Sequence, residues 1–168
     1  GDIASLTAAN AQFADKNVKT GPAMFTTVRA ADLEYSTETR IAHYTGGVHL
    51  ERPGLTVDSK ELRAYLKNSD SDSSLDKAFA DGAVKIISTT TVPKKGKRIR
   101  TGTSEHGEYY VDEQRVYLSG GQPSVVDSEK GRTATQGQGC DLTWWANDDR
   151  LQVGGQPSCS VQTVIPKK

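Results

Sequence analysis

Apolar and polar residues alternate along much of this chain in short runs, the pattern of strands with one buried face. The clearest example is a pair of runs on either side of a Pro53-Gly54 turn, with apolar residues at Val48, Leu50, Leu55 and Val57. Proline presets one torsion of a tight turn and glycine takes a positive one. This stretch therefore predicts a β-hairpin, within a region, 28–66, that reads as successive strands.

The phrase Gly-Gly-Gln-Pro-Ser occurs twice, at 120–124 and again at 154–158. Each copy follows an aromatic residue, a polar turn, an arginine and alternating apolar residues. Similar units precede it, running from an aromatic residue at Tyr35 or Tyr65 to a glycine-marked return strand. An internal repeat of this kind predicts a chain built by stacking hairpin units, with loops of variable length between them.

The rest of the pattern also favours strands. Helix propensity alone would make 75–80 a helical turn, but its place in the repeat predicts a strand. The β-branched stretch 86–92 predicts a strand, as do short runs from Arg100 onward, the last ending near Ile165. Residues 1–27 fit the repeat poorly, and 4–14 have the pattern of a short helix. Because the pattern predicts no crossover helices, the fold classes that remain are a sandwich, a jelly roll or an open barrel.

Composition narrows the class of protein further. The 168 residues predict one domain over 1–168, and only 35% of them are hydrophobic, as expected for strands with a wet face. Twenty-one basic and 21 acidic residues cancel, so no overall field would attract nucleic acid. No apolar run approaches the length of a membrane span. The chain begins Gly1-Asp2, which we interpret as a processed protein or a fragment.

Two cysteines, Cys140 and Cys159, leave two readings open. They are too few for a disulfide scaffold and lack the CxxC spacing of a zinc site. A single disulfide in an oxidising compartment and two buried free thiols both fit the sequence.

The sequence offers no catalytic centre. None of the three histidines, His43, His49 and His106, stands in a nucleophile or HExxH motif. The pair Asp148-Asp149 falls on a predicted turn, where such residues usually serve backbone hydrogen bonding. We therefore expect no enzyme activity, no metal and no cofactor.

One dense basic run stands out, with cations at Lys94, Lys95, Lys97, Arg98 and Arg100. It is consistent with a solvated hairpin tip that discourages edge pairing, or with contact to an anion such as a phosphorylated glycolipid headgroup. The aromatic residues that would stack nucleic-acid bases are missing from it. The headgroup candidates are Lys94, Lys95, Lys97 and Arg98.

Apolar and aromatic residues recur at matching places in the units. Their simplest role is to form the core, and the alternative is that some line a gap between two sheets that admits lipid. Each buried methylene would then contribute ~0.8 kcal/mol. The candidate groove residues are Leu33, Tyr35, Val48, Leu50, Val57, Leu62, Tyr65, Val84, Ile86, Tyr110, Val116, Leu118 and Leu142.

Three stretches resemble the OstA-like family of lipopolysaccharide transport, which comprises LptA, LptC and the N-terminal domain of LptD. Residues 31–50 are similar to its unit "Ala-x-x-Leu-x-Tyr, turn, Gly-x-Val-x-Leu". Residues 57–65 resemble the following strand, and 76–86 match the return "Ala-x-Gly-x-Val-x-Ile". With 100–126, the likeness covers about 28–126 and extends weakly to 160. The GGQP bends and the Trp144-Trp145 pair depart from the family pattern.

The resemblance implies an all-β fold, a twisted, open, taco-like β-jelly roll of two antiparallel sheets. It also implies a non-enzymatic periplasmic domain that holds lipid A acyl chains between the sheets. Its implied partners are lipopolysaccharide and other Lpt jelly-roll domains, joined by edge-strand pairing that bridges the membranes, with a homo-oligomer among the options. An anchor to the inner membrane, or a place in a larger outer-membrane protein, is left open.

Two alternatives come from other classes. A structural β-repeat scaffold would have a tightly filled interior with no room for a chain. A carbohydrate-active jelly-roll protein would need convergent carboxylates in a cleft, and no such pair is evident.

Overall fold

The computed structural model describes residues 13–14, 25–67, 74–137, 139–148, 150–155 and 157–165. These residues form thirteen strands and contain no helix, so none offers a helix able to cross a bilayer. Residues 75–80 are strand, as the repeat predicts. Of the predicted helix at 4–14, only Phe13–Ala14 is described, and it is a strand; the remainder lies outside the described residues. The strands are β1 Phe13–Ala14, β2 Phe25–Arg29, β3 Asp32–Ser36, β4 Ile41–Arg52, β5 Leu55–Leu66, β6 Leu75–Val92, β7 Gly96–Tyr110, β8 Arg115–Ser119, β9 Ser124–Asp127, β10 Gly131–Gln136, β11 Asp141–Trp145, β12 Leu151–Gly154 and β13 Ser160–Val164.

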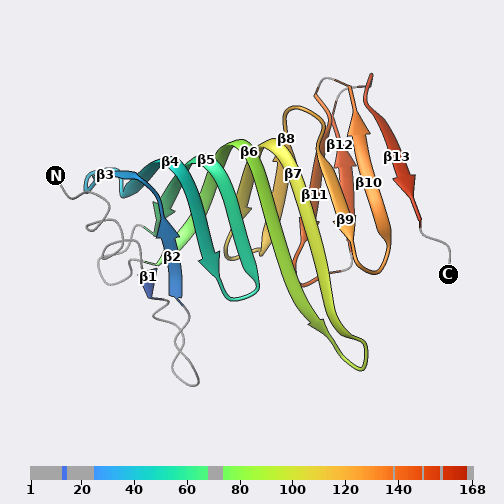
Figure 1. Ribbon diagram of the computed structural model, residues 1–168, viewed down its shortest axis with the longest axis horizontal. Helices are drawn as coiled ribbons and strands as arrows, with labels where there is room; N and C mark the ends of the chain where they lie inside the picture. Colours follow the sequence, from blue (N-terminus) through green and yellow to red (C-terminus); the bar gives the residue numbers. More distant parts are fainter. Residues whose placement is uncertain are drawn as a thin grey trace.

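Among the described strands every pairing is antiparallel, and the sheet that they form does not close on itself. Strands β4, β5, β6 and β7 are long and bend sharply, so that each runs through both layers of the molecule (Figure 1). Shorter strands extend only one layer: β8 pairs with residues 106–110 of β7, whereas β9 pairs with residues 100–103. One sheet is thus folded over into two facing layers, and the predicted open jelly roll is confirmed.

The bends lie in one row across neighbouring strands. Register shifts occur between Thr45 and Val48, between Asp58 and Glu61, and between Asp81 and Val84. Gly46 and Gly82 take positive φ angles of 87° at these places, a conformation that side chains with a Cβ rarely adopt. A Cβ on Gly46 would also lie 2.6 Å from that of Ala31. Bulges with glycine therefore fold the sheet along one line.

We call the two halves layer 1 and layer 2. Layer 1 holds β3, residues 41–45, 61–66, 75–81 and 106–110 of the long strands, and then β8, β11 and β12. Layer 2 holds β2, residues 48–52, 55–58, 84–92 and 96–104, and then β9, β10 and β13. The row of bends closes one side of the fold. The hairpin tips point to the opposite, open side, which we call the mouth (Figure 1).

The core fills the space between the layers. Trp144, Tyr44, Leu50, Leu118 and Leu142 have no exposed surface. Gly107 has no side chain where the side chains of Val84 and Ile86 approach, so packing is tight near the bends. The buried cluster spans β2 to β11 without a break, which gives the fold one continuous core.

Candidate functional site

A cavity of about 380 Å³ lies between the layers at the mouth. Arg52, Pro53, Gly54 and Leu55 line it from the β4–β5 hairpin of layer 2, and layer 1 faces them across the gap. Its volume lies within the range of about 300–1,000 Å³ typical of ligand sites. The layer 1 lining includes Lys67, Ser74, Leu75, Tyr109, Val111, Asp112, Gln114 and Ala146.

A second cavity, of about 730 Å³, continues along the mouth and shares Thr90, Gln114 and Ala146 with the first. Lys95 and Lys130 stand on its layer 2 side. The two cavities together form an elongated opening between the hairpin tips. The first cavity has an apolar part, which includes Leu55 and Leu75, beside hydroxyl side chains such as Thr26. The lining of the second cavity is mostly polar and charged.

Nine of the predicted groove residues lie between the layers but deeper than the mouth. Each is at most 4% exposed, and none lines either mouth cavity. Leu33 packs against this core and is half-buried. The nine are Val48, Leu50, Val57, Leu62, Val84, Ile86, Val116, Leu118 and Leu142.

Two predicted groove residues, Tyr65 and Tyr110, do not face the space between the layers, and their assignment is corrected. Tyr65 and Tyr110 each lie next to a buried residue in their strand, Ala64 and Tyr109. Because successive side chains of a strand point to opposite faces, both lie on the outer face of layer 1. Tyr35 lies opposite the buried Ala42, on the inner face of layer 1, but it is 44% exposed because β3 pairs only with β4 among the described strands. In the Tyr109-Tyr110 pair it is Tyr109 that lines the mouth.

The predicted headgroup cations fall into two kinds. Lys94, Lys95 and Lys97 are exposed at the tip of the β6–β7 hairpin. Arg98 is instead buried, and its guanidinium donates to both carboxylate oxygens of Asp127, at 3.1 Å and 2.6 Å. Burial by itself would raise the pKa of Asp127, but the hydrogen bonds from Arg98 and the Glu129 backbone, together with the charges of Arg98 and Arg100, outweigh it and the pKa is lowered. Arg98 thus anchors the base of the basic tip to β9.

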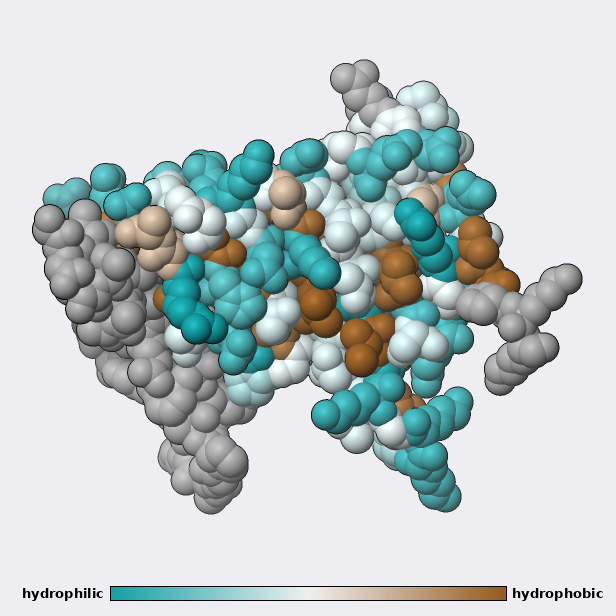
Figure 2. All heavy atoms as spheres, viewed as in Figure 1, coloured by the Kyte–Doolittle hydropathy of each residue, from teal (hydrophilic) through white to brown (hydrophobic). Residues whose placement is uncertain are grey.

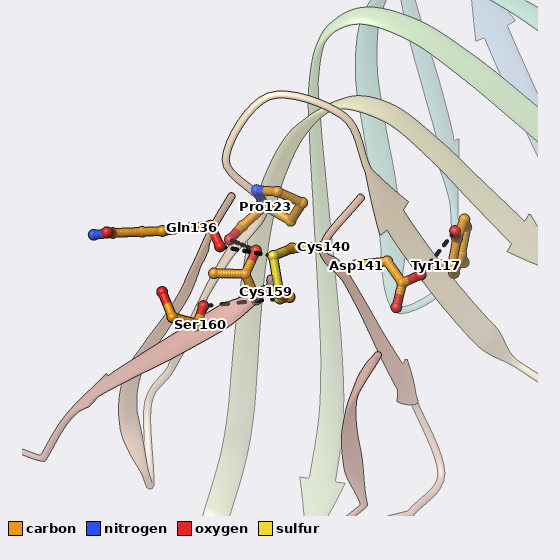
Figure 3. Close-up of a disulfide and its surroundings, with 8 residues drawn as sticks. Tyr117, Pro123, Gln136, Cys140, Asp141, Cys159 and Ser160 are labelled. Atoms are coloured by element: carbon orange, nitrogen blue, oxygen red, sulfur yellow. Dashed lines mark hydrogen bonds between the residues drawn. A yellow bond between two sulfur atoms is a disulfide. The ribbon is translucent and has the colours of Figure 1, made fainter. Parts of the chain in front are cut away.

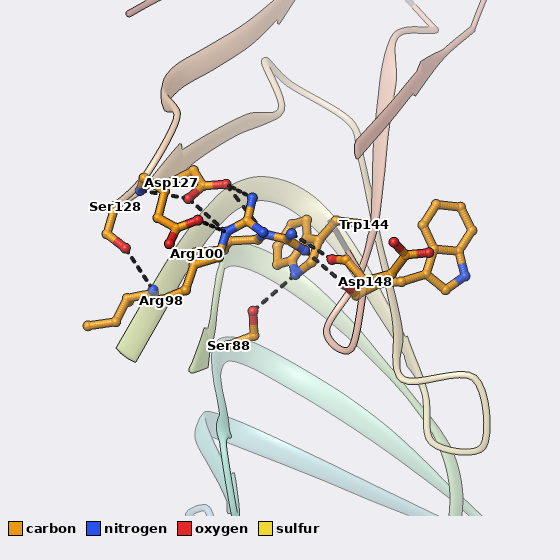
Figure 4. A network of polar contacts seen from close by, with 10 residues as sticks. Ser88, Arg98, Arg100, Asp127, Ser128, Trp144 and Asp148 are labelled. Carbon is orange, nitrogen blue, oxygen red and sulfur yellow. Dashed lines mark hydrogen bonds and ion pairs between the residues drawn. The ribbon is translucent and has the colours of Figure 1, made fainter. Parts of the chain in front are cut away.

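Arg100 connects the two layers on the C-terminal side of the mouth (Figure 4). Its guanidinium donates to the carbonyl oxygens of Trp145, at 2.8 Å, and of Asp148, at 2.7 Å. The carboxylate of Asp127 lies 3.5 Å from its Nε. Nearby, the Trp144 indole donates to the Ser88 hydroxyl at 3.0 Å. Polar contacts therefore join layer 2 to layer 1 in this half of the fold.

The rim of the first cavity is less tightly held. Arg52 donates to the Thr26 hydroxyl at 3.0 Å, and its guanidinium lies 6.0 Å from the centre of the Tyr109 ring across the mouth. Lys67 pairs with Asp112 at 3.2 Å within layer 1. Asp112 is largely exposed, and surface ion pairs of this kind contribute little to stability.

The cysteines form a disulfide, which decides between the two readings left open by the sequence (Figure 3). Cys140 directly precedes β11 of layer 1, and Cys159 directly precedes β13 of layer 2. The bond therefore ties the start of the last described strand to the body of the fold. β13 pairs only with β10 among the described strands, and all its side chains are exposed.

The histidines lie on outer faces beside carboxylates. His49 contacts Asp58 at 2.7 Å, and this hydrogen bond raises the pKa of the imidazole. His106 contacts Asp81 and Glu108, each at 2.7 Å. Burial lowers the pKa of His106, but the bonds to Glu108 and Asp81 outweigh it and raise the pKa. Within the described residues, no group of three or more His, Cys, Asp or Glu is arranged to hold a metal.

The end of the fold that carries β12 and β13 exposes apolar side chains. Leu151 is 38% exposed on β12, Val161 is 50% exposed on β13, and Ile165 beyond it is 73% exposed. The face of the molecule in Figure 2 is mostly polar, with apolar patches across its middle and at this end. The stacked layers thus end in an uncovered apolar margin.

Comparison with known proteins places these features in context. A family model described as "LptA/(LptD N-terminal domain) LPS transport protein" matches residues 27–143. No curated protein matches the chain. Among solved structures, the chain is similar to LptH of Pseudomonas aeruginosa, described as the LptA homologous periplasmic component of the lipopolysaccharide transport device. The TM-score is 0.68 at 15% identity, over 84% of this chain and 95% of that chain, a likeness of fold.

Proposed function

The chain belongs to the LptA/LptD N-terminal domain family of lipopolysaccharide transport proteins, and from this we propose that it carries lipid A acyl chains in the mouth between its two layers. The domain acts without catalysis. Its compartment is the periplasm, a proposal supported by the disulfide, which belongs to an oxidising environment, and by the periplasmic description of LptH.

The observation that carries the proposal is the cavity between the layers. The apolar part of its lining includes Leu55, Leu75 and Tyr109, which are almost completely buried. Each acyl methylene taken from water into such a surface gains ~0.8 kcal/mol, so several methylenes suffice for useful binding. Deeper residues such as Leu50 and Leu118 have no exposed surface. An acyl chain therefore enters at the mouth, and reaches these residues only if the layers move apart.

The phosphorylated headgroup would then lie at the basic tip. Lys94, Lys95 and Lys97 stand exposed on the layer 2 side of the mouth, and Lys130 lines the adjoining cavity. Lysine ammonium groups bind phosphate as mobile point charges. Arg98 takes an indirect part, since its bonds to Asp127 hold the strand from which the tip projects.

We further propose that the edge strands join this domain to other Lpt jelly-roll domains or to a second copy of itself. β13 has the sequence SVQTV, without the lysine or proline that commonly protects edge strands. Backbone pairing to such an edge gives affinity, and the apolar margin of Leu151, Val161 and Ile165 supplies further burial. Joined domains would make the two-layered groove continuous from one to the next.

Photo-crosslinking tests the cargo proposal. The photoreactive amino acid p-benzoylphenylalanine replaces Tyr109 or Gln114 at the mouth, with Lys85, exposed on the outer face of layer 2, as the matched control position. Irradiation with lipopolysaccharide is expected to give adducts from both mouth positions and none from Lys85. Equal labelling at all three positions, or no labelling of the folded protein, would contradict the proposal; the second result would favour a structural scaffold.

A further inference from the structure

Six residues form a continuous row across the outer face of layer 1. Strand register places Tyr65 of β5 opposite Lys77 of β6, Lys77 opposite Tyr110 of β7, Tyr110 opposite Arg115 of β8, and Arg115 opposite Trp145 of β11. The guanidinium of Arg150 then lies 3.8 Å from the centre of the Trp145 ring. We call these residues the outer row: Tyr65, Lys77, Tyr110, Arg115, Trp145 and Arg150.

The outer row alternates aromatic rings with cations. The Lys77 ammonium lies 5.1 Å from the centre of the Tyr65 ring, and the Arg115 guanidinium lies 4.1 Å from that of Tyr110. Phe79 stands beside the row, with its ring centre 5.1 Å from that of Tyr65. A cation held against a ring in this way has few orientations left. Its N–H donors are therefore in place before a ligand arrives.

Carboxylates accompany the cations. Glu113 pairs with Arg115 at 2.5 Å, and Asp148 lies 3.7 Å from the Nε of Arg150. The Tyr110 hydroxyl donates to Glu108, and burial together with this bond raises the pKa of the phenol to about 12. The surface thus combines ring faces, cationic donors and anionic acceptors within one strip.

The outer row follows the rim of the mouth. The residues next to it in sequence line the first cavity: Val111 follows Tyr110, Gln114 precedes Arg115, and Ala146 follows Trp145. Each row member in β5, β6, β7, β8 and β11 has an inward-facing, buried neighbour in its strand. A ligand whose tails enter the mouth therefore leaves its remaining parts close to this strip.

We propose that the outer row binds the saccharide part of the glycolipid whose acyl chains enter the mouth; this inference rests on the function proposed above. Sugar hydroxyls need both donors and acceptors, and the strip supplies both. The C–H faces of sugar rings pack on aromatic rings. Tyr65 and Tyr110, and again Tyr110 and Trp145, are two strand spacings apart, roughly 9–10 Å, so several sugar units can be contacted in a line.

Phosphate and anionic membrane surfaces fit the strip less well. Glu108, Glu113 and Asp148 lie among its three cations, and like charges repel an anion at short range. The tip of the β6–β7 hairpin carries three exposed lysines, and the run from Lys94 to Arg100 contains no acidic residue. This density of cations suits the tip better to phosphate. The two surfaces would thus divide sugar and phosphate between the two sides of the mouth.

The test uses a saccharide without acyl chains. The probe is the water-soluble oligosaccharide released from lipopolysaccharide by mild acid and then freed of phosphate. Nuclear magnetic resonance titration of the backbone amides is expected to show shifts along the outer row. The variants Tyr110→Leu and Trp145→Leu should each lose roughly tenfold in affinity, while Tyr110→Phe and Trp145→Phe, which keep a ring, should lose little.

Tyr117→Leu is the matched control. Tyr117 lies on the same outer face, two residues along β8 from Arg115, and is outside the row. The inference is overturned if Tyr117→Leu weakens binding as much as Tyr110→Leu, if the wild-type protein does not bind the probe, or if only the phosphorylated oligosaccharide binds. Crosslinking of acyl chains from position 114 tests the cargo proposal separately. If the protein binds the saccharide but gives no acyl crosslink, the cargo proposal is rejected and the saccharide inference is retained.

Discussion

Replacing Arg100 by methionine removes the guanidinium that joins the layers and keeps most of the apolar stem. The wild-type side chain, 4% exposed, donates to two carbonyl oxygens of layer 1 at 2.8 Å and 2.7 Å. Hydrogen bonds from a charged donor contribute about 1.5–3 kcal/mol each. The variant also leaves the carbonyls of Trp145 and Asp148 without this donor.

We therefore expect Arg100→Met to lower the free energy of unfolding by about 3–5 kcal/mol, the range for breaking a buried charged pair. Total stabilities of domains are about 5–15 kcal/mol, so the variant should still fold. Asp127 limits the loss because it keeps both bonds from Arg98.

The assay is urea unfolding followed by tryptophan fluorescence, with the disulfide intact. Arg63→Met is the control, because Arg63 is exposed on the outer face of layer 1 and such surface changes stay within about 0.5 kcal/mol. The slope with urea should be unchanged in both variants. A loss below about 1 kcal/mol for Arg100→Met would refute the inference that Arg100 fastens the layers.

Three further changes test other parts of the fold. Replacing both Cys140 and Cys159 by serine should lower the free energy of unfolding by about 3 kcal/mol for a loop of this length. The backbone amides of Ser160–Val164 should also lose protection from hydrogen exchange. Unchanged protection would show that pairing with β10 alone holds β13. Gly102→Ala places a Cβ 2.6 Å from both Leu118 and Trp144 and should cost about 1–3 kcal/mol by overpacking, whereas an unchanged urea midpoint would contradict the packing described. Folding lowers the pKa of Asp127 below 3.8, so the contribution of its carboxylate to stability is present above that pH and is lost as the pH falls through the folded pKa. Asp127→Asn should therefore flatten the acid dependence of the free energy of unfolding between about pH 5 and 2. An acid profile identical to that of the wild type would reject this role.

The fold was largely predictable from the sequence because its signal is local and repeated. The Pro53-Gly54 hairpin and the strand at 75–80 follow from alternation and from the repeat, and both are confirmed. The family resemblance is confirmed by the family model that matches residues 27–143. Which strands bend, and where, was not predicted, because a bulge depends on pairing with the neighbouring strand.

The candidate site was less predictable. The repeat aligned Tyr65 and Tyr110 with inward-facing residues, although a shift of one residue in a strand moves a side chain to the opposite face. The bonding of Arg98 to Asp127 joins residues 29 positions apart, which no spacing rule reveals. Leu75 and Tyr109 line the mouth only because the folded sheet brings its hairpin ends together. The structure places Tyr109 opposite the buried Val116 across β7 and β8, a pairing that the sequence alone does not show.

The most direct measurement of the central claim is contact between acyl chains and named methyl groups. In methyl-labelled protein bound to lipid A, nuclear Overhauser effects from acyl methylenes should reach Leu55, Leu75 and Val111 at the mouth. They should not reach Val126, which is 49% exposed on the outer face of layer 2. Contacts confined to Val126 and other exposed methyl groups would contradict a groove that carries its cargo between the layers.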